Sequence, residues 1–288
     1  MAKPFVNPFV SGQFLELRVD ALVSDGRGLG RHDGVVVLVE DALPGQLVRA
    51  RVAAVRKSLA EAALVEVLER SPDEQEPPCP HAGRCGGCSW QSLAYGRQLA
   101  WKERIVHDAL ERVGKVACPP MLPILPSPSE WGYRNKMEFA FGVSGDGGKA
   151  LGLRERGSRN IVGVTGCLLQ TPLTMRVLEA VRMLSNGAFH DLDGRFLVVR
   201  EPNAGGCFVE LIVGAGGSLE AGERFAEALR AETPEVTGFA LSERLAPSDV
   251  AYGERALYAD GRLEERIGDV RLQMGHTGVR ARWMYGCR

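Results

Sequence analysis

Three cysteines within ten residues constrain the middle of the chain more than any other feature. The stretch CPHAGRCGGC places Cys79, Cys85 and Cys88 at the spacing C-x5-C-x2-C, and its interspersed glycines let the backbone fold closely around a common centre. A fourth cysteine, Cys167, lies in the distant, turn-rich segment TGCLLQ. Four thiolates from two places in the sequence can enclose either a zinc ion or an iron–sulfur cluster.

The spacing favours a cluster slightly over zinc, because zinc ribbons usually contain a second C-x2-C motif and none follows here. Both metal sites are favoured well over three inert thiols. Disulfides are a poor alternative, since seven cysteines cannot all pair within one chain. The N-terminal residues MAKPFVNPFVSGQF also lack the continuous apolar core of a signal peptide, and no apolar run reaches the roughly 20 residues that cross a bilayer. A cytoplasmic protein is therefore expected, with Cys118, Cys207 and Cys287 as buried apolar residues.

Short β-branched segments separated by turn signals fill residues 14–70, and this pattern predicts a small β-barrel over residues 1–70. The glycine run Gly26, Gly28, Gly30 lies between two such segments. A nucleotide-binding glycine loop would open a helix. The run is therefore interpreted as a structural loop between barrel strands.

A proline-rich and acidic stretch marks a boundary near residue 71, so residues 71–94 are predicted to form a separate cysteine loop. Residues 95–278 are predicted to form an α+β domain with a mostly antiparallel sheet. Its expected elements are an amphipathic helix over 92–113, the strand YRNKMEFAFG, helices near 172–184 and 219–231, and hairpins in FLVVREPNAGGCFVELIVG and RALYADGRLEERI.

The net charge of −1 excludes a protein that holds nucleic acid by bulk charge, so any such binding must use local patches. Residues 95–160 contain eleven Lys/Arg and seven Asp/Glu. Arg134 and Lys136, on one face of a predicted strand, are the first candidates for RNA contacts. Arg27 and Arg31 are next, because loop arginines beside glycines can approach phosphates closely. For each residue a solvated surface charge is about equally expected.

The barrel, the cysteine spacing and the YRNKMEFAFG strand together resemble the RNA 5-methyluridine (uracil-5) methyltransferases. The resemblance is closest to the bacterial 23S ribosomal RNA group with an N-terminal TRAM domain, and it runs from about residue 12 to about residue 278. It implies methylation of uracil C5 in 23S ribosomal RNA with S-adenosylmethionine, and RNA binding by the barrel and central domain. It also implies a structural [4Fe-4S] cluster on Cys79, Cys85, Cys88 and Cys167. A monomer is the default expectation.

The sequence departs from that family near its end. After GDVRLQMGHTG the family continues into a domain with the S-adenosylmethionine site and the catalytic Cys and Glu, whereas this chain reads VRARWMYGCR. Residues 279–288 are therefore expected to be an aberrant tail, as after a frameshift, and no residue is assigned to catalysis. The chain alone is expected to be inactive. The alternatives are a stand-alone RNA-binding module with a structural metal centre, and a zinc-stabilised fold without an RNA role.

Overall fold

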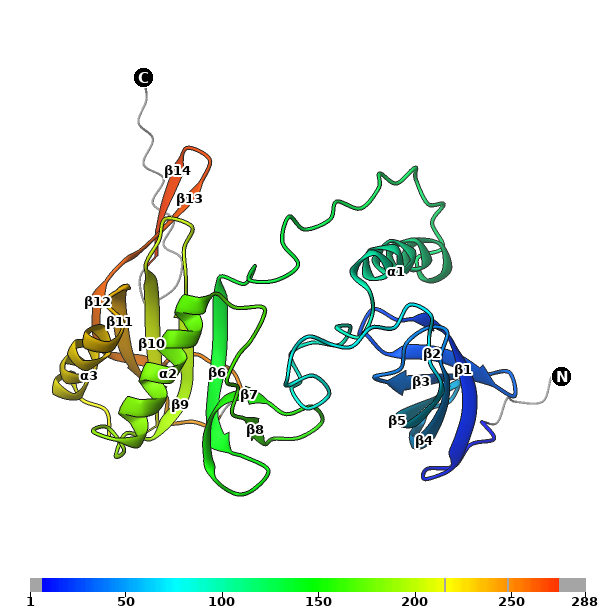
Figure 1. Cartoon of the computed structure of the whole chain (residues 1–288), viewed down its shortest axis with the longest axis horizontal. Coiled ribbons are helices and arrows are strands. Elements are labelled where there is room, and N and C mark those ends of the chain that lie inside the picture. Colours follow the sequence, from blue (N-terminus) through cyan, green and yellow to red (C-terminus); the bar gives the residue numbers. More distant parts are fainter. Residues whose placement is uncertain (1–6, 215, 248, 275–288) are drawn as a thin grey trace. The chain divides into compact units, whose positions relative to one another are not determined.

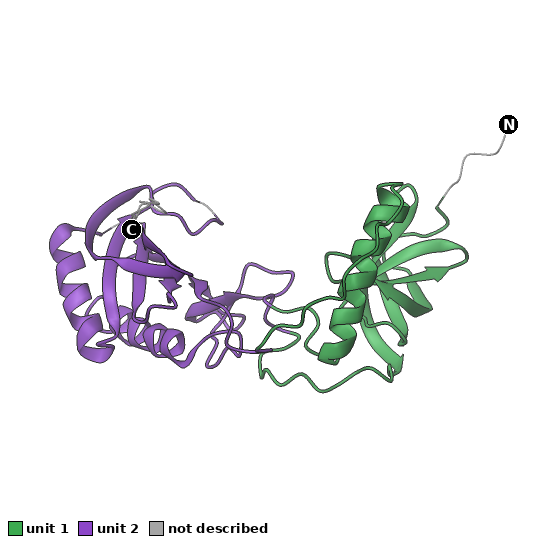
Figure 2. Ribbon diagram, turned by 90° about the horizontal axis from the view of Figure 1, so that it is seen from above, with its two compact units in different colours: residues 1–83, 88–128 green, residues 84–87, 129–288 purple. Residues whose placement is uncertain are grey.

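The computed structural model of the protein describes residues 7–214, 216–247 and 249–274. The chain divides into two compact units, coloured separately in Figure 2. Unit 1 comprises residues 1–83 and 88–128, and unit 2 comprises residues 84–87 and 129–288. The first helix thus belongs with the barrel, whereas the division inferred from the sequence grouped it with the central domain. The boundaries at 70 and 94 stay predictions.

Unit 1 contains the predicted barrel (Figure 1). Its strands close in the order β1-β2-β3-β5-β4, with β3 and β5 parallel and the other pairs antiparallel. Alternate side chains of β1 are buried, as expected for strands whose inner face forms a core. The strands are β1 (Phe14–Leu22), β2 (Gly28–His32), β3 (Val35–Glu40), β4 (Leu47–Val55) and β5 (Leu59–Glu69).

Two of the three glycines of this run are part of the barrel wall, which corrects their interpretation as loop residues, whereas Gly26 lies in the loop before β2. Gly28 and Gly30 lie within β2, and Gly30 pairs with Val19 of β1 and Val37 of β3. A Cβ at Gly28 would lie 2.6 Å from the carbonyl oxygen of Ala42. The glycines therefore allow close backbone approach, and the structural role expected for them is confirmed.

Helix α1 (Tyr95–Asp108) continues as a π-helical turn, η1 (Ala109–Val113). Together the two elements match the helix predicted over 92–113. Its buried residue, Trp101, packs with Leu93 and with Leu22 and Leu43 of the barrel region. This shared apolar cluster explains why the helix belongs to unit 1.

Unit 2 is built on a seven-stranded sheet with the order β12-β11-β10-β9-β6-β7-β8 (Figure 1). Only β10 and β11 pair in parallel, so the predicted mostly antiparallel sheet is confirmed for the described residues. The strands are β6 (Lys136–Val143), β7 (Lys149–Arg154), β8 (Ile161–Val162), β9 (Gly194–Arg200), β10 (Cys207–Val213), β11 (Val236–Glu243) and β12 (Arg255–Gly261).

Two helices, α2 (Pro172–Asn186) and α3 (Leu219–Glu232), cover one face of this sheet. The main core lies between them and the sheet, where Phe225 of α3 packs against Phe239 of β11. Thr171 and Ser218 cap the helix N-termini by accepting hydrogen bonds from backbone N–H groups. Because α3 connects β10 to β11, these two strands can run in parallel. The α+β class is confirmed.

The last predicted hairpin is placed differently from the expectation. The segment RALYADG forms the edge strand β12, while LEERI forms β13 (Leu263–Ile267), which pairs with β14 (Val270–Met274). β12 ends at Gly261 and β13 begins at Leu263, so only one residue separates the two strands, which is too short for a hairpin turn between them. The tail predicted over 279–288 lies outside the described residues. Among the helices within 7–214, 216–247 and 249–274, none is long and apolar enough to cross a membrane.

Candidate functional site

The first candidate for nucleic-acid contact is the start of β6. Arg134 precedes the strand, its backbone N–H donates to the carbonyl oxygen of Leu169 at 3.0 Å, and its side chain is exposed. Lys136 is also exposed and forms an ion pair with Glu138, the next residue on the same face of β6. Of the two, only Arg134 has a cation without an interaction partner among the described residues. Arg134 is therefore the stronger candidate.

A third cation, Arg200, was missed by the sequence reasoning. It ends β9, and its Cα lies directly opposite that of Lys136 in the β6–β9 ladder. Residues directly opposite on neighbouring strands share a face, so both basic side chains lie on the sheet face away from α2 and α3. Nothing within β9 alone indicates this partner. Only the strand pairing brings the two residues together.

The barrel candidates differ from each other. Arg27 donates from Nε and Nη2 to one carboxylate oxygen of Asp25, at 3.0 and 2.7 Å, and this pairing raises the pKa of Arg27 and lowers the pKa of Asp25. Its charge is thus largely offset by a neighbour. Arg31 lies on β2 and is exposed, and within the described part of the chain its guanidinium donates only to the carbonyl oxygen of Gly34, at 3.4 Å. Arg31 is the better placed of the two for a phosphate.

The four cysteines of the predicted metal site belong two to each unit. Cys79 and Cys88 lie in unit 1, Cys85 and Cys167 lie in unit 2, and all four are half-buried. Within the part of the chain that the structure describes, no three His, Cys, Asp or Glu side chains form a group that could hold a metal ion. The assignment of these four cysteines as metal ligands stays a prediction.

The segment around Cys85 is nevertheless held by regular backbone pairing in unit 2. The N–H of Gly86 donates to the carbonyl oxygen of Arg154 at 3.0 Å, and the N–H of Arg156 donates to that of Arg84 at 2.8 Å. Cys85 and Glu155 form an antiparallel bridge between these bonds. Residues 84–87 are thus fixed against the end of β7, which gives Cys85 a defined position in its unit.

Cys207, expected as a buried apolar residue, is buried in the core of unit 2. Burial raises the pKa of its thiol to about 12. Because the thiolate is the reactive form, we expect Cys207 in the folded protein to react with iodoacetamide at pH 8 on the order of a hundredfold more slowly than in the denatured protein. Mass spectrometry of tryptic peptides after a short pulse measures this, with half-buried Cys118 as the internal control. Equal rates for Cys207 in both states would contradict its burial.

The comparisons with known proteins agree with these features. The TRAM domain family matches residues 8–65. An uncharacterized RNA methyltransferase of Nitratidesulfovibrio vulgaris is 45% identical, over 93% of this chain and 60% of its own length. A second, from Synechocystis sp., is 30% identical over 92% of this chain and 59% of its own length.

Among solved structures, the Pyrococcus abyssi tRNA (uracil-54, C5)-methyltransferase in complex with S-adenosyl-L-homocysteine has a similar fold, with a TM-score of 0.64 and 22% identity. The match covers 89% of this chain and 58% of that one. The chain thus spans about 60% of the length of the curated relatives that align with nearly all of it. Residues 8–65 match the TRAM domain family, and the fold of the chain is similar to that of the solved Pyrococcus abyssi enzyme. Over more than nine-tenths of its length, the chain is similar to proteins named RNA methyltransferases.

Proposed function

We propose that this protein takes part in the S-adenosylmethionine-dependent methylation of uracil C5 in 23S ribosomal RNA, and that the present residues supply RNA binding. The observation that carries the proposal is the combination of a TRAM barrel with an exposed cation, Arg134, that has no partner among the described residues. The proposal includes a monomer acting in the cytoplasm. It assigns none of the described residues to S-adenosylmethionine or to the nucleophile.

The proposed RNA surface has two parts, one in each unit. In unit 2 it consists of Arg134, Lys136 and Arg200, and in unit 1 of Arg31 with Arg27 as a weaker member. Phosphate contacts from Lys and Arg fix the position of an RNA strand without reading its sequence. This division of roles suits a chain that grips RNA while methyl transfer is carried out by other residues.

Removing two cations from the unit 2 surface tests this assignment. In the double variant Arg134→Ala/Lys136→Ala, we expect RNA affinity to fall about tenfold or more at moderate salt, because two phosphate contacts are lost. Each lost contact should also reduce the magnitude of the slope of log affinity against log salt by roughly 0.7 to 1. Fluorescence anisotropy of a labelled RNA fragment measures both quantities. The control Lys102→Ala/Arg112→Ala removes the same charge from α1 and η1. If both variants weaken binding equally, only net charge matters and the surface is wrongly assigned.

We propose further that Cys79, Cys85, Cys88 and Cys167 ligate a structural [4Fe-4S] cluster. Support comes from their spacing and from the fixed position of residues 84–87 in unit 2. Protein purified without oxygen should contain about four iron and four sulfide ions per chain. The variant Cys85→Ser should lose them and Cys118→Ser should keep them. Bound zinc, or no metal, would refute the cluster.

A further inference from the structure

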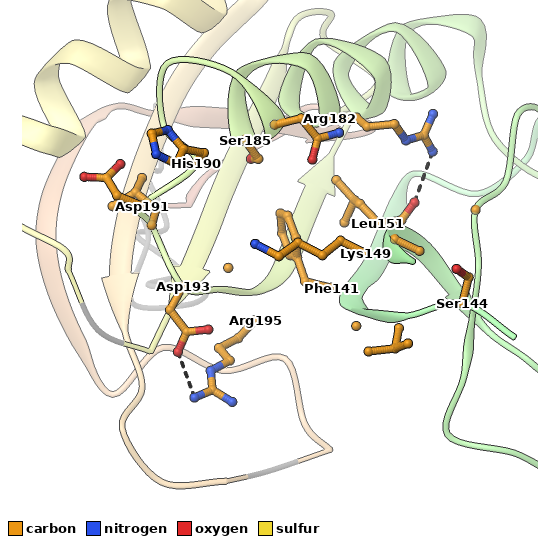
Figure 3. A pocket seen from close by; sticks show the side chains of 17 residues that line it. Phe141, Ser144, Lys149, Leu151, Arg182, Ser185, His190, Asp191, Asp193 and Arg195 are labelled. Atoms are coloured by element: carbon orange, nitrogen blue, oxygen red, sulfur yellow. Dashed lines mark hydrogen bonds and ion pairs between the residues drawn. The ribbon is translucent and has the colours of Figure 1, made fainter. Parts of the chain in front are cut away.

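A cavity of about 820 Å³ lies in unit 2, at the opposite end of β6 from Arg134. Its lining comes from the end of β6, the start of β7, the C-terminal turn of α2 and the segment that leads into β9 (Figure 3). Pockets that bind small organic groups measure roughly 300–1,000 Å³. The cavity is therefore large enough for a nucleotide.

Most of the charges around this cavity are already compensated. Arg195 pairs with Asp193 at 2.9 Å. Arg182 pairs with Glu179 and donates to the carbonyl oxygens of Leu151 and Val164, both at 3.0 Å. These arginines therefore form the wall of the cavity, and their cations are engaged.

Two opposite charges remain among the residues that line the cavity. Lys149 and Asp191 are both exposed, and neither side chain has an ion-pair partner in the described part of the chain. Figure 3 shows Lys149 extending across the cavity toward the side formed by His190 and Asp191. A ligand that complements this pair has an anionic group for Lys149 and hydrogen-bond donors for Asp191.

Two further groups add an aromatic surface and a hydrogen-bond acceptor. The ring of Phe141 lies in the middle of the cavity (Figure 3), and the backbone of Gly194 packs against it so closely that a Cβ there would lie 2.9 Å from ring carbons. Nδ1 of His190 is 3.0 Å from the carbonyl oxygen of Gly187. Because a carbonyl only accepts, Nδ1 must carry the proton and neutral His190 offers Nε2 as an acceptor.

We propose that this cavity binds one unstacked ribonucleotide, an inference that rests on the proposed RNA-binding function. The base stacks on Phe141, the phosphate pairs with Lys149, and the ribose hydroxyls donate to Asp191. Single-stranded RNA is bound in this way, by aromatic stacking and by contacts to the 2′-hydroxyl that DNA lacks. A free amino acid would also satisfy both charges, but it would fill only a small part of the cavity. The cavity is thus a second RNA contact, separate from Arg134 and Lys136.

Two variants of the full chain test the cavity by affinity for a short single-stranded oligoribonucleotide. Lys149→Met removes the unpaired cation. Gly163→Leu fills space, because a Cβ at this lining glycine meets no atom within 4 Å. We expect each to weaken binding by about five- to thirtyfold, the range expected when one stacked or ionic nucleotide contact is lost. Lys102→Met, which removes an equal charge from α1, should change affinity less than twofold. A third variant, Asp191→Asn, should reduce the preference for RNA over DNA of the same sequence.

The outcomes separate this inference from the proposed function. If the unaltered chain binds RNA and only Arg134→Ala/Lys136→Ala weakens it, the cavity proposal is overturned while the function stands. If the cavity variants do weaken binding, titration with 5′-mononucleotides shows whether the cavity binds a free nucleotide or a nucleotide within an RNA strand. If mononucleotides displace RNA from the unaltered chain but not from Lys149→Met, the cavity also accepts a free nucleotide. If Lys149→Met weakens oligomer binding and mononucleotides do not compete, the cavity accepts only a nucleotide within a strand. A chain that binds neither RNA nor mononucleotide overturns both.

Discussion

Replacing Gly30 by alanine is expected to destabilise the barrel of unit 1 by about 3 kcal/mol or more, which exceeds the usual range for overpacking. A Cβ at this position would overlap the carbonyl oxygen of Arg18 and the side chain of Leu17 on β1. The carbonyl is backbone and cannot rotate away, and β2 is also held on its other side by β3. A closed barrel therefore has to distort as a whole to admit one methyl group.

Hydrogen exchange measured by mass spectrometry resolves this effect by unit. We expect much faster exchange in peptides of unit 1 and little change in peptides of unit 2. Gly96→Ala is the matched control, because a Cβ there meets no atom within 4 Å and alanine favours a helix more than glycine. Protection equal to that of the unaltered protein in Gly30→Ala would show that the glycine is not required for strand contact.

The second large effect is expected from Phe225→Ala in α3. Phe225 is fully buried, and its ring lies 4.8 Å from that of Phe189 and 5.5 Å from that of Phe239 between centroids. Truncation removes apolar contacts and leaves a cavity, which typically costs about 3–5 kcal/mol. The loss should fall on unit 2 because all three rings belong to its core.

The same exchange experiment measures this prediction, with the pattern reversed. Peptides of β9, β10 and β11 should lose protection, while those of the barrel keep it. Leu219→Ala in the same helix serves as the control, since Leu219 is 59% exposed and its truncation should have little effect. If both units lose protection together in Phe225→Ala, the two units fold as one and their division is incorrect.

The sequence predicted the elements of this fold well because their signals are local. Alternating burial in β1, and the helical spacing of apolar residues before Gly114, follow from the periods of strand and helix. The errors concern partners distant in sequence. Gly30 is a glycine because Arg18 lies against it, and β12 pairs with β11 instead of with β13. Neither pairing is encoded in a short segment.

The candidate site shows the same limit. Arg134 and Lys136 could be chosen from the alternation of one strand, but Arg200 becomes a candidate only through its register with Lys136. The pairing of Arg27 with Asp25, two residues away, could have been predicted from the sequence, and it makes Arg27 a weaker candidate for a phosphate contact. The cavity around Lys149 joins four segments of the chain, so it could not be recognised from any one of them.

The measurement that tests the central claim most directly is the affinity of the unaltered chain for a uridine-containing fragment of 23S ribosomal RNA at increasing salt. The account predicts binding at low salt whose logarithm falls in a straight line against the logarithm of salt concentration, as expected when several phosphates are neutralised. Absence of binding at low salt, with both units shown to be folded by hydrogen exchange, would contradict it.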